Sequence, residues 1–598
     1  EILEARRADL MEVAGSETGK TLDQSDPEVT EAIDFAHYYA EQAKKLGRIS
    51  GAEFVPAGLT VVTPPWNFPV AIPAGSTLAA LAAGSPVIIK PAAQARRCGA
   101  VMVEALWEAG VPRDALQLVN MGDRALGSKL VSDPRVDRVI LTGGYETAEL
   151  FRSLRNDLPL LAETSGKNAI IVTPSADLDL AAKDVIYSAF GHAGQKCSAA
   201  SLVVLVGSVA TSQRFRNQLI DGVSSLKVGY PQDATTQMGP IIEPAKGKLL
   251  SALTSVGKGE KWLVEPKQLD ESGKLWSPGV RDGVKAGSEY HLTEYFGPVL
   301  GIMTARTLEE AIALVNAIDY GLTSGIHSLD ADEVGLWLDS IQAGNLYVNR
   351  GTTGAIVQRQ PFGGWKKSAV GAGTKAGGPN YLFGLGNWEI AATADIGQAP
   401  TSKHVLTLLD AIERSETLNG GELAWIRQGT SLDQFAWSTE FGQAVDVSQL
   451  GVERNVFRYR SVPTQIRLME EGSPVELFRV VLAAMRAESN FTVSVPGTLN
   501  ERYMWALQAT GIRVDQRSDQ SWLKSLNELD LTNARIRLIG GSASQITAVT
   551  NGRPDVAVYA GPVLLAGRIE MLPFLREQAV SITAHRFGTP NHLSDALI

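Results

Sequence analysis

Short runs of aliphatic and β-branched residues alternate with stretches of helical periodicity through the first third of the chain. The runs predict strands at residues 59–63, 86–90, 116–119, 138–142, 158–162, 169–172 and 202–206. The helical spacing of apolar residues predicts helices at 73–83, 100–109 and 148–154. Such an alternation is typical of an α/β fold with a largely parallel, doubly wound sheet.

The same kind of pattern continues in two further parts of the chain. A second α/β stretch follows at residues 175–358, after which glycine and proline crowd residues 360–379. Beyond residue 392, strands are predicted at 457–461, 491–495, 536–539 and 556–559, and helices at 475–487 and 501–510. We therefore expect a first domain over 1–174 with a bridging segment near 38–58, a second over 175–358, a linking segment over 359–392 and a third domain over 393–598.

Composition narrows the class of protein. The 598 residues are 44% hydrophobic and 20% charged, as in ordinary globular proteins, and no apolar run is long enough for a membrane span. A net charge of −10 disfavours general binding to nucleic acid or anionic lipid, so small molecules are the expected ligands. Two cysteines make no disulfide framework, which predicts a reducing compartment such as the cytoplasm. The chain begins at Glu1 inside a helical pattern, and we expect a fragment of a longer protein.

Cys197 is the first candidate for chemistry. It lies in the small-residue stretch Gly194-Gln195-Lys196-Cys197-Ser198, where a thiol is better placed to react than to pack. The thiolate is the nucleophile, and a carbonyl is its natural target when a base is close. The alternative is a buried cysteine that acts as a small hydrophobe. Cys98, at the start of an apolar helix, fits that alternative.

Three polar residues at predicted strand ends are further candidates. Glu163 has apolar and small neighbours, so partial burial would raise its pKa towards that of a general base; the alternative is a surface carboxylate. Asn67, held between prolines and aromatic residues, could donate to an oxyanion or form an Asx turn. Lys90 could reach ribose hydroxyls or face solvent.

These segments occur in the order and approximate spacing of a known family. The chain resembles the aldehyde dehydrogenase superfamily over roughly residues 1–392, through seven motifs. They are Pro65-Trp66-Asn67-Phe68-Pro69, Lys90-Pro91, Thr142-Gly143-Gly144, Glu163-Thr164-Ser165-Gly166-Lys167, Gly194-Gln195-Lys196-Cys197, Glu294-Tyr295-Phe296-Gly297-Pro298 and Pro361-Phe362-Gly363-Gly364.

The resemblance implies roles for the matching residues. Cys197 would be the nucleophile, Glu163 the base that activates the deacylating water, and Asn67 with the Cys197 backbone N–H the oxyanion hole. NAD is the implied cofactor of residues 1–174, and residues 175–358 are the implied catalytic domain; no metal is implied. The implied NAD contacts are Trp66, Lys90, Thr142, Gly143, Gly144, Glu294 and Phe296.

The sequence departs from the family in the pyrophosphate-binding region. Gly144 stands where serine is common, and Ala148 where the fingerprint often ends in glycine. A G-x-G-x-x-G loop is absent, although this superfamily binds its cofactor without one.

Finer details resemble the subgroup that oxidises L-glutamate γ-semialdehyde, the hydrolysed form of pyrroline-5-carboxylate. By that resemblance Ser198, Gly354 and Ala355 would bind the substrate's α-carboxylate, because backbone N–H groups in a glycine turn form an anion-binding nest. For Gly354 a turn that needs positive φ is the alternative. Residues 365–372 differ from, and are longer than, the short serine-glycine loop common in the family.

Residues 453–460 and 575–586 resemble parts of the extra C-terminal domain of the longer bifunctional proline-oxidising enzymes of the proline utilisation A type. That domain resembles a degenerate aldehyde dehydrogenase fold; residues 393–598 contain no cysteine, so we expect a non-catalytic lid or a substitute for a dimer partner. In such proteins a proline dehydrogenase barrel that binds FAD precedes this region, and it is absent from this chain, so FAD is not predicted. A proline dehydrogenase domain, fused or separate, is the implied partner, and a homodimer stays open.

The resulting hypothesis is NAD-dependent oxidation of L-glutamate γ-semialdehyde to L-glutamate, the second step of proline catabolism, through a thiohemiacetal and a thioester. Two alternatives stay open at this point. One is an aldehyde dehydrogenase for another semialdehyde, such as succinic semialdehyde. The other is a non-catalytic scaffold that binds NAD.

Overall fold

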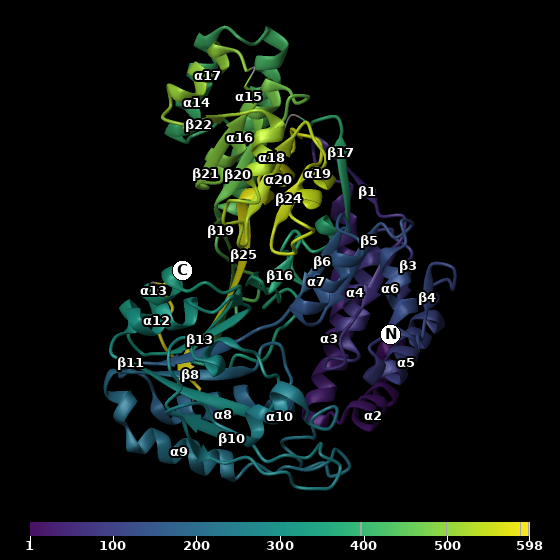
Figure 1. The fold of residues 1–598 in the computed structure, drawn as a ribbon, viewed down its shortest axis with the longest axis vertical. Helices are drawn as coiled ribbons and strands as arrows, with labels where there is room; N and C mark the ends of the chain where they lie inside the picture. Colours follow the sequence, from purple (N-terminus) through teal and green to yellow (C-terminus); the bar gives the residue numbers. More distant parts are fainter. Residues whose placement is uncertain (395–396, 498, 587, 596) are drawn as a thin grey trace.

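The computed structural model describes residues 1–598 except 395–396, 498, 587 and 596. Figure 1 shows two sheets in the lower part of the molecule and a third in the upper part, which the last third of the chain forms. The strands and helices predicted from the sequence are confirmed, most of them to within two or three residues at each end. Among the described residues, no helix is long and apolar enough to cross a membrane.

The first sheet has six strands in the order β16-β6-β5-β2-β3-β4. Five of them run parallel, and β16 is antiparallel to β6. The strands are β2 (Thr60–Thr63), β3 (Val87–Ile89), β4 (Leu116–Leu118), β5 (Arg138–Thr142), β6 (Leu160–Glu163) and β16 (Ala369–Val370). The accompanying helices are α4 (Ala71–Ala82), α5 (Arg96–Glu108), α6 (Arg124–Ser132) and α7 (Tyr145–Leu154).

The strands that the sequence pattern assigned to one doubly wound sheet belong to two different sheets. The chain leaves the first sheet after β6, and β7 (Asn168–Val172) and β8 (Ala200–Val206) lie in a second sheet of ten strands. Every residue of β7 is buried, as expected for a parallel strand covered on both faces. The turn between β6 and β7 therefore joins the two sheets.

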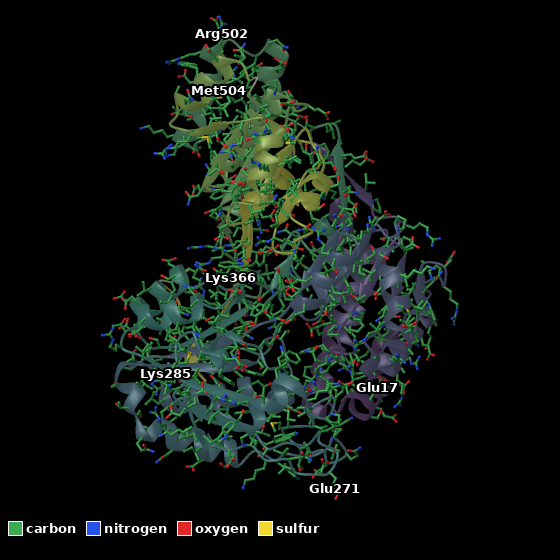
Figure 2. The ribbon with its side chains drawn as sticks, viewed as in Figure 1. Glu17, Glu271, Lys285, Lys366, Arg502 and Met504 are labelled. Atoms are coloured by element: carbon green, nitrogen blue, oxygen red, sulfur yellow. The ribbon has the colours of Figure 1, made fainter. Side chains whose placement is uncertain are left out.

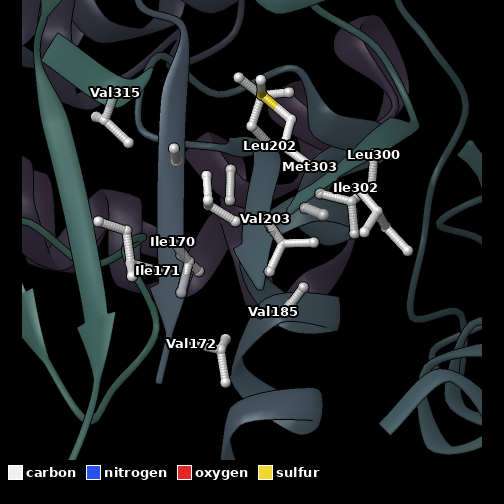
Figure 3. Close-up of a cluster of buried hydrophobic side chains, with 14 of the residues drawn as sticks. Ile170, Ile171, Val172, Val185, Leu202, Val203, Leu300, Ile302, Met303 and Val315 are labelled. Atoms are coloured by element: carbon white, nitrogen blue, oxygen red, sulfur yellow. The ribbon is translucent and has the colours of Figure 1, made fainter. Parts of the chain in front are cut away.

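The ten-stranded sheet has the order β18-β19-β25-β14-β13-β7-β8-β11-β10-β9. Its central strands are parallel and pack around the largest group of buried side chains, part of which Figure 3 shows on β7, β8 and β11. Its remaining strands are β9 (Lys261–Val264), β10 (Gly279–Asp282), β11 (Val299–Ala305), β13 (Thr323–His327), β14 (Asn345–Val348), β18 (Val445–Asp446), β19 (Glu453–Ser461) and β25 (Leu575–Thr583).

A separate core holds the upper part of the molecule together. Its five parallel strands have the order β22-β21-β20-β23-β24. They are β20 (Thr464–Leu468), β21 (Phe491–Val495), β22 (Val514–Gln516), β23 (Arg535–Ile539) and β24 (Ala557–Tyr559). Helix α16 (Pro474–Arg486) carries Arg479, whose guanidinium makes two bonds of 2.7 Å to Asp433 on α15 (Gly420–Ala436), both side chains fully buried.

Strands β19 and β25 connect the upper part to the lower part. They pair antiparallel along all nine residues of β25, and residues 579–582 of β25 also pair parallel with β14. Figure 1 shows the two strands running from the upper part down into the ten-stranded sheet. Segments from the predicted third domain thus complete the sheet of the predicted second domain.

Candidate active site

A cavity of about 360 Å³ lies where the first and second sheets meet. The carboxyl ends of strands, such as Thr142 on β5 and Glu163 on β6, and the turns that follow them contribute to its wall, as expected for open α/β sheets. It is lined by all the predicted site residues except Lys90, namely Trp66, Asn67, Thr142, Gly143, Gly144, Glu163, Cys197, Ser198, Glu294, Phe296, Gly354 and Ala355. The structure therefore brings together residues that are up to 289 positions apart, from Trp66 to Ala355.

The loop that carries Cys197 has a special backbone. His192, Ala193 and Gly194 have φ values of +52°, +54° and +66°, so three successive residues are left-handed. A side chain at Gly194 would fall on the carbonyl oxygen of Gly297, so only glycine fits there. This run turns the chain from α8 (Leu178–Phe190) towards β8 and places the thiol at the cavity wall.

Hydrogen bonds then fix the loop. Asn168 donates from Nδ2 to the carbonyl oxygens of Cys197, at 2.7 Å, and Ala199, at 3.0 Å. Asn67 donates from Nδ2 to the carbonyl oxygen of Gln195 at 3.1 Å. The amide nitrogen of Asn67 carries two hydrogens, so one remains for another acceptor beside the thiol.

The thiol of Cys197 is neutral in this environment. Burial raises its pKa to about 12, and the nearby carboxyl groups of Glu163 and Glu294 act in the same direction, while the backbone N–H of Ser198 opposes them. Nucleophilic attack therefore requires a base that takes the proton of the thiol.

Glu163, the last residue of β6, has the properties of that base. Burial raises its pKa to about 8, as its apolar sequence neighbours predict, and the ammonium of Lys375 opposes the rise. Its Oε2 accepts a hydrogen bond of 3.2 Å from the backbone N–H of Gly364. A carboxyl group with a pKa near neutral can accept a proton at one stage and release it at another.

Two residues that the sequence did not single out support Glu163. Lys375 donates from Nζ to Asn345 Oδ1 at 2.8 Å and to the carbonyl oxygen of Gly363. Its backbone N–H donates at 2.6 Å to Oε2 of Glu577, on β25. Burial lowers the pKa of Lys375 and raises that of Glu577, and each charge favours the charged form of the other. No spacing or motif could have indicated Glu577, because β25 brings it from 414 positions away from Glu163.

One end of the cavity presents backbone N–H groups and a carboxyl group. Gly144 is the N-cap of α7 and has no side-chain cap, so backbone N–H groups at this helix terminus can meet an anion. Gly143 precedes it, and its backbone N–H donates at 3.1 Å to the carbonyl oxygen of Glu163. Glu294 accepts a 2.9 Å bond from the backbone N–H of Gly166, and burial raises its pKa. Lys90 lies outside the cavity wall.

The aromatic residues predicted beside the cofactor also meet there. The rings of Trp66 and Phe296 lie 5.6 Å apart, with an angle of 87° between their planes. This edge-to-face pair forms an apolar part of the wall next to the cysteine loop.

The other end of the cavity combines a glycine turn with carboxylates. Gly354 has a φ of +147°, and the space where its side chain would stand is open. Helix α3 (Leu22–Leu46) contributes Glu28 and Glu31, which the sequence did not indicate. Glu28 is saturated: it pairs with Lys20 and accepts from the backbone N–H groups of Val70, at 2.7 Å, and Ala71, at 3.0 Å.

Glu31, by contrast, makes no hydrogen bond or ion pair within the described part of the chain. Burial and the charge of Glu28 raise its pKa to about 8. Its carboxyl group therefore faces the cavity with its bonding capacity free. A cationic ligand group beside it would lower its pKa and satisfy it.

Comparisons with known proteins show the family of this chain. Residues 1–384 match the family described as the aldehyde dehydrogenase family. A 1-pyrroline-5-carboxylate dehydrogenase of Geobacillus sp. (strain WCH70) is 36% identical over 401 residues, which are 64% of this chain and 77% of that protein. The enzyme of that name from Bacillus subtilis (strain 168) is 35% identical with the same coverage.

Solved structures extend the match to the rest of the chain. Proline utilization A (PutA) from Corynebacterium freiburgense has a TM-score of 0.86 and 46% identity, over 98% of this chain and 56% of that one. The chain thus spans little more than half the length of that protein. A Thermus 1-pyrroline-5-carboxylate dehydrogenase with bound NAD has a TM-score of 0.61 and 32% identity, over 65% of this chain and 78% of that one.

Proposed function

The chain belongs to the aldehyde dehydrogenase family, and on that premise we propose that it oxidises L-glutamate γ-semialdehyde to L-glutamate with NAD. The relatives and solved structures most similar to it include proteins named for 1-pyrroline-5-carboxylate dehydrogenation and for proline utilization. The observation that carries the proposal for this chain is that Cys197, Glu163 and the free carboxyl group of Glu31 line one cavity.

The catalytic residues divide the reaction between them. Cys197 Sγ attacks the aldehyde carbon, and Glu163 takes the proton that the thiol loses. The Asn67 amide and the Cys197 backbone N–H then donate to the oxygen that gains charge, in a cavity where such bonds are strong. Glu163 then releases that proton to solvent, takes a proton from the water that attacks the thioester, and passes it to the departing sulfur of Cys197, which leaves a carboxylate product and restores the thiol.

The residues of this cavity fit NAD, whose chemistry when bound is to accept a hydride. The uncapped N-terminus of α7, with Gly143 and Gly144, would hold the pyrophosphate, because amide N–H groups and the helix dipole favour an anion there. Glu294 would accept hydrogen bonds from a ribose, and Trp66 with Phe296 would provide the apolar wall. We do not assign Lys90 a direct contact, since it lies outside the cavity wall.

The α-ammonium and the α-carboxylate of the substrate each match a feature of the cavity wall. Glu31 would pair with the α-ammonium, because its carboxyl group has no partner in the described chain and faces the cavity. The glycine turn at Gly354, with Ala355 and Ser198, would donate N–H and O–H groups to the α-carboxylate. A semialdehyde without the amino group would leave Glu31 unpaired.

The organisation of the longer protein follows from the same match. We propose that a proline dehydrogenase, fused or separate, supplies the substrate, since the chain resembles PutA along 98% of its own length but spans only 56% of that chain. We further propose a reducing, cytoplasmic setting, because both cysteines are free thiols.

The test is incubation with L-glutamate γ-semialdehyde and NAD, with reduced cofactor followed by absorbance. We expect turnover by the unmodified chain and none by Cys197→Ala, which leaves the residues around the cofactor intact. Cys98→Ala is the matched control, since Cys98 is buried in a different cluster and its substitution should leave turnover unchanged. Retained turnover in Cys197→Ala would remove that residue from the mechanism, and equal turnover of succinic semialdehyde would remove the assigned substrate.

A further inference from the structure

A second cavity of about 670 Å³ lies between the segment 364–373 and the C-terminal sheet. Its wall includes residues 364–366 on one side and the amino ends of β20, β21, β23 and β24 on the other. Figure 2 labels Lys366 at the junction between the upper and lower parts of the molecule. None of the residues that line the first cavity lines this one.

The wall of this cavity carries an arginine without a polar partner. The guanidinium of Arg576, on β25, lies 3.7 Å from the centroid of the Trp365 ring. Within the described residues it makes no hydrogen bond or ion pair, and its Nε is buried without an acceptor. The stacking orients the planar group but leaves its N–H donors available.

Two further cations stand beside it. Arg535 donates from Nη1 to the carbonyl oxygens of Leu572, Pro573 and Leu575, at 3.4, 3.2 and 2.6 Å, which are neutral acceptors. Lys366 donates from Nζ to the backbone carbonyl oxygens of residues 316 and 318. These bonds hold the side chains in place without neutralising their charge.

The cluster and its burial together disfavour the charged form of Arg576. Burial lowers the pKa of Arg576 to about 10, and the charges of Arg535 and Arg460 add to the lowering. Burial also lowers the pKa of Lys366 to about 8, and Arg576 contributes. Positive charges therefore repel one another in a partly buried space.

The acidic residues of the wall do not neutralise these cations. Asp555 makes bonds of 3.0 and 2.8 Å to Arg553. Asp530 accepts a 2.9 Å bond from the backbone N–H of Thr532. In the described chain neither forms an ion pair with Arg576, Arg535 or Lys366, so the cavity keeps an excess of positive charge.

We propose that this cavity binds a small oxyanion, the carboxylate or phosphate group of a metabolite, on the guanidinium groups of Arg576 and Arg535. A guanidinium presents parallel N–H donors that match both kinds of group, and an anion between the two arginines removes their repulsion. The site has a physical connection to the catalytic base. Trp365 donates from Nε1 to the carbonyl oxygen of Glu577 at 2.8 Å, and Gly364, also in the wall, donates to Glu163.

The test is isothermal titration calorimetry of the full chain in Tris chloride at constant ionic strength, with sodium phosphate and sodium succinate titrated separately. We expect at least one probe to bind, and the tighter one identifies the ligand as a phosphate or a carboxylate compound. Arg576→Gln and Arg535→Gln should each weaken that binding at least about tenfold, because each removes charge-assisted hydrogen bonds. Arg502→Gln is the matched control, since Arg502 is exposed on α17 (Glu501–Gln508), far from the cavity in Figure 2.

A chemical measurement on the unmodified chain tests the same site without any substitution, so it does not depend on whether the variants fold. Phenylglyoxal modifies free guanidinium groups, and the bound probe should protect Arg576 at least about tenfold against it while leaving Arg502 reactive, because a bound oxyanion occupies the N–H donors. The proposal is overturned if neither probe binds, if Arg576→Gln binds as the unmodified chain does, or if Arg576 is not protected.

Discussion

Replacing Lys375 by methionine tests how the buried base is tuned. Methionine keeps the length and apolar body of the side chain but removes the ammonium that lowers the pKa of Glu163. Glu163 acts as a base only when it is ionised, so activity is present above its pKa and is lost as the pH falls through it. With the pKa at about 8, the low-pH limb of the profile should lie near that value.

The magnitude follows from the charge that is removed. A nearby opposite charge lowers a carboxyl pKa by about 1 to 3, and Lys375 acts on Glu163 through its charge without direct contact, so Lys375→Met should raise the pKa of Glu163 by about 1. At pH 7 a base with a pKa of about 8 is about one-tenth ionised, and one with a pKa of about 9 only about one-hundredth. Turnover at pH 7 should therefore fall about tenfold, while turnover above about pH 10 should recover.

The assay is kcat across the pH range, combined with rapid mixing at pH 7. Since thioester hydrolysis depends on Glu163 more than the oxidation step does, the variant should show a burst of reduced cofactor followed by a slow steady state. Lys367→Met is the matched control, because Lys367 lies in the same loop but pairs with Asp319 at 2.7 Å near the surface. An unmoved low-pH limb in Lys375→Met would refute the assigned coupling between Lys375 and Glu163.

Two further substitutions test local features of the fold. Gly194→Ala puts a side chain onto the Gly297 carbonyl oxygen at a left-handed position, so kcat should fall about 100-fold because the cysteine loop is displaced. Gly335→Ala, at an open helical position, is the control and should leave kcat unchanged. Equal effects of the two substitutions on kcat would contradict the strain argument. Arg479→Ala leaves a buried carboxylate without its partner and should lower the free energy of unfolding of the upper part by about 3 to 5 kcal/mol, measured by urea denaturation. Arg427→Ala, which removes an exposed ion pair, should change it by less than about 1 kcal/mol, and a similar loss in both variants would argue against a special role for the buried pair.

Local sequence patterns predicted most of the helices and strands because their signals are local. Apolar runs at 138–142 and 536–539 and helical spacing at 475–487 each depend on neighbours within a few residues, and the structure confirms all three. The placement of β7 in a second sheet has no such signal. It depends on which strands the chain meets after the turn at residues 164–167, which is a property of the whole fold.

The residues of the candidate site also fall into those that local motifs predicted and those that only the fold reveals. Cys197, Glu163 and Asn67 lie in motifs with recognisable neighbours, and the structure brings all three to one cavity. Glu31 and Glu577 carry no such local signature, because a lone glutamate in a helix or strand usually faces water. Glu31 lies at the cavity wall because α3 packs there, and Glu577 is buried because β25 packs beside the segment that carries Lys375.

The placement of β25 has a consequence for how the protein is made. Residues 575–583 begin 227 positions after Val348, the end of β14, yet they cover the edge of that strand in the sheet that carries the nucleophile. Until they arrive, β14 presents unpaired N–H and C=O groups, the kind of edge that attracts strands from other chains. A polypeptide whose synthesis stops between β14 and β25 would thus carry an open strand edge prone to aggregate, and the ten-stranded sheet cannot be completed until β25 has been made.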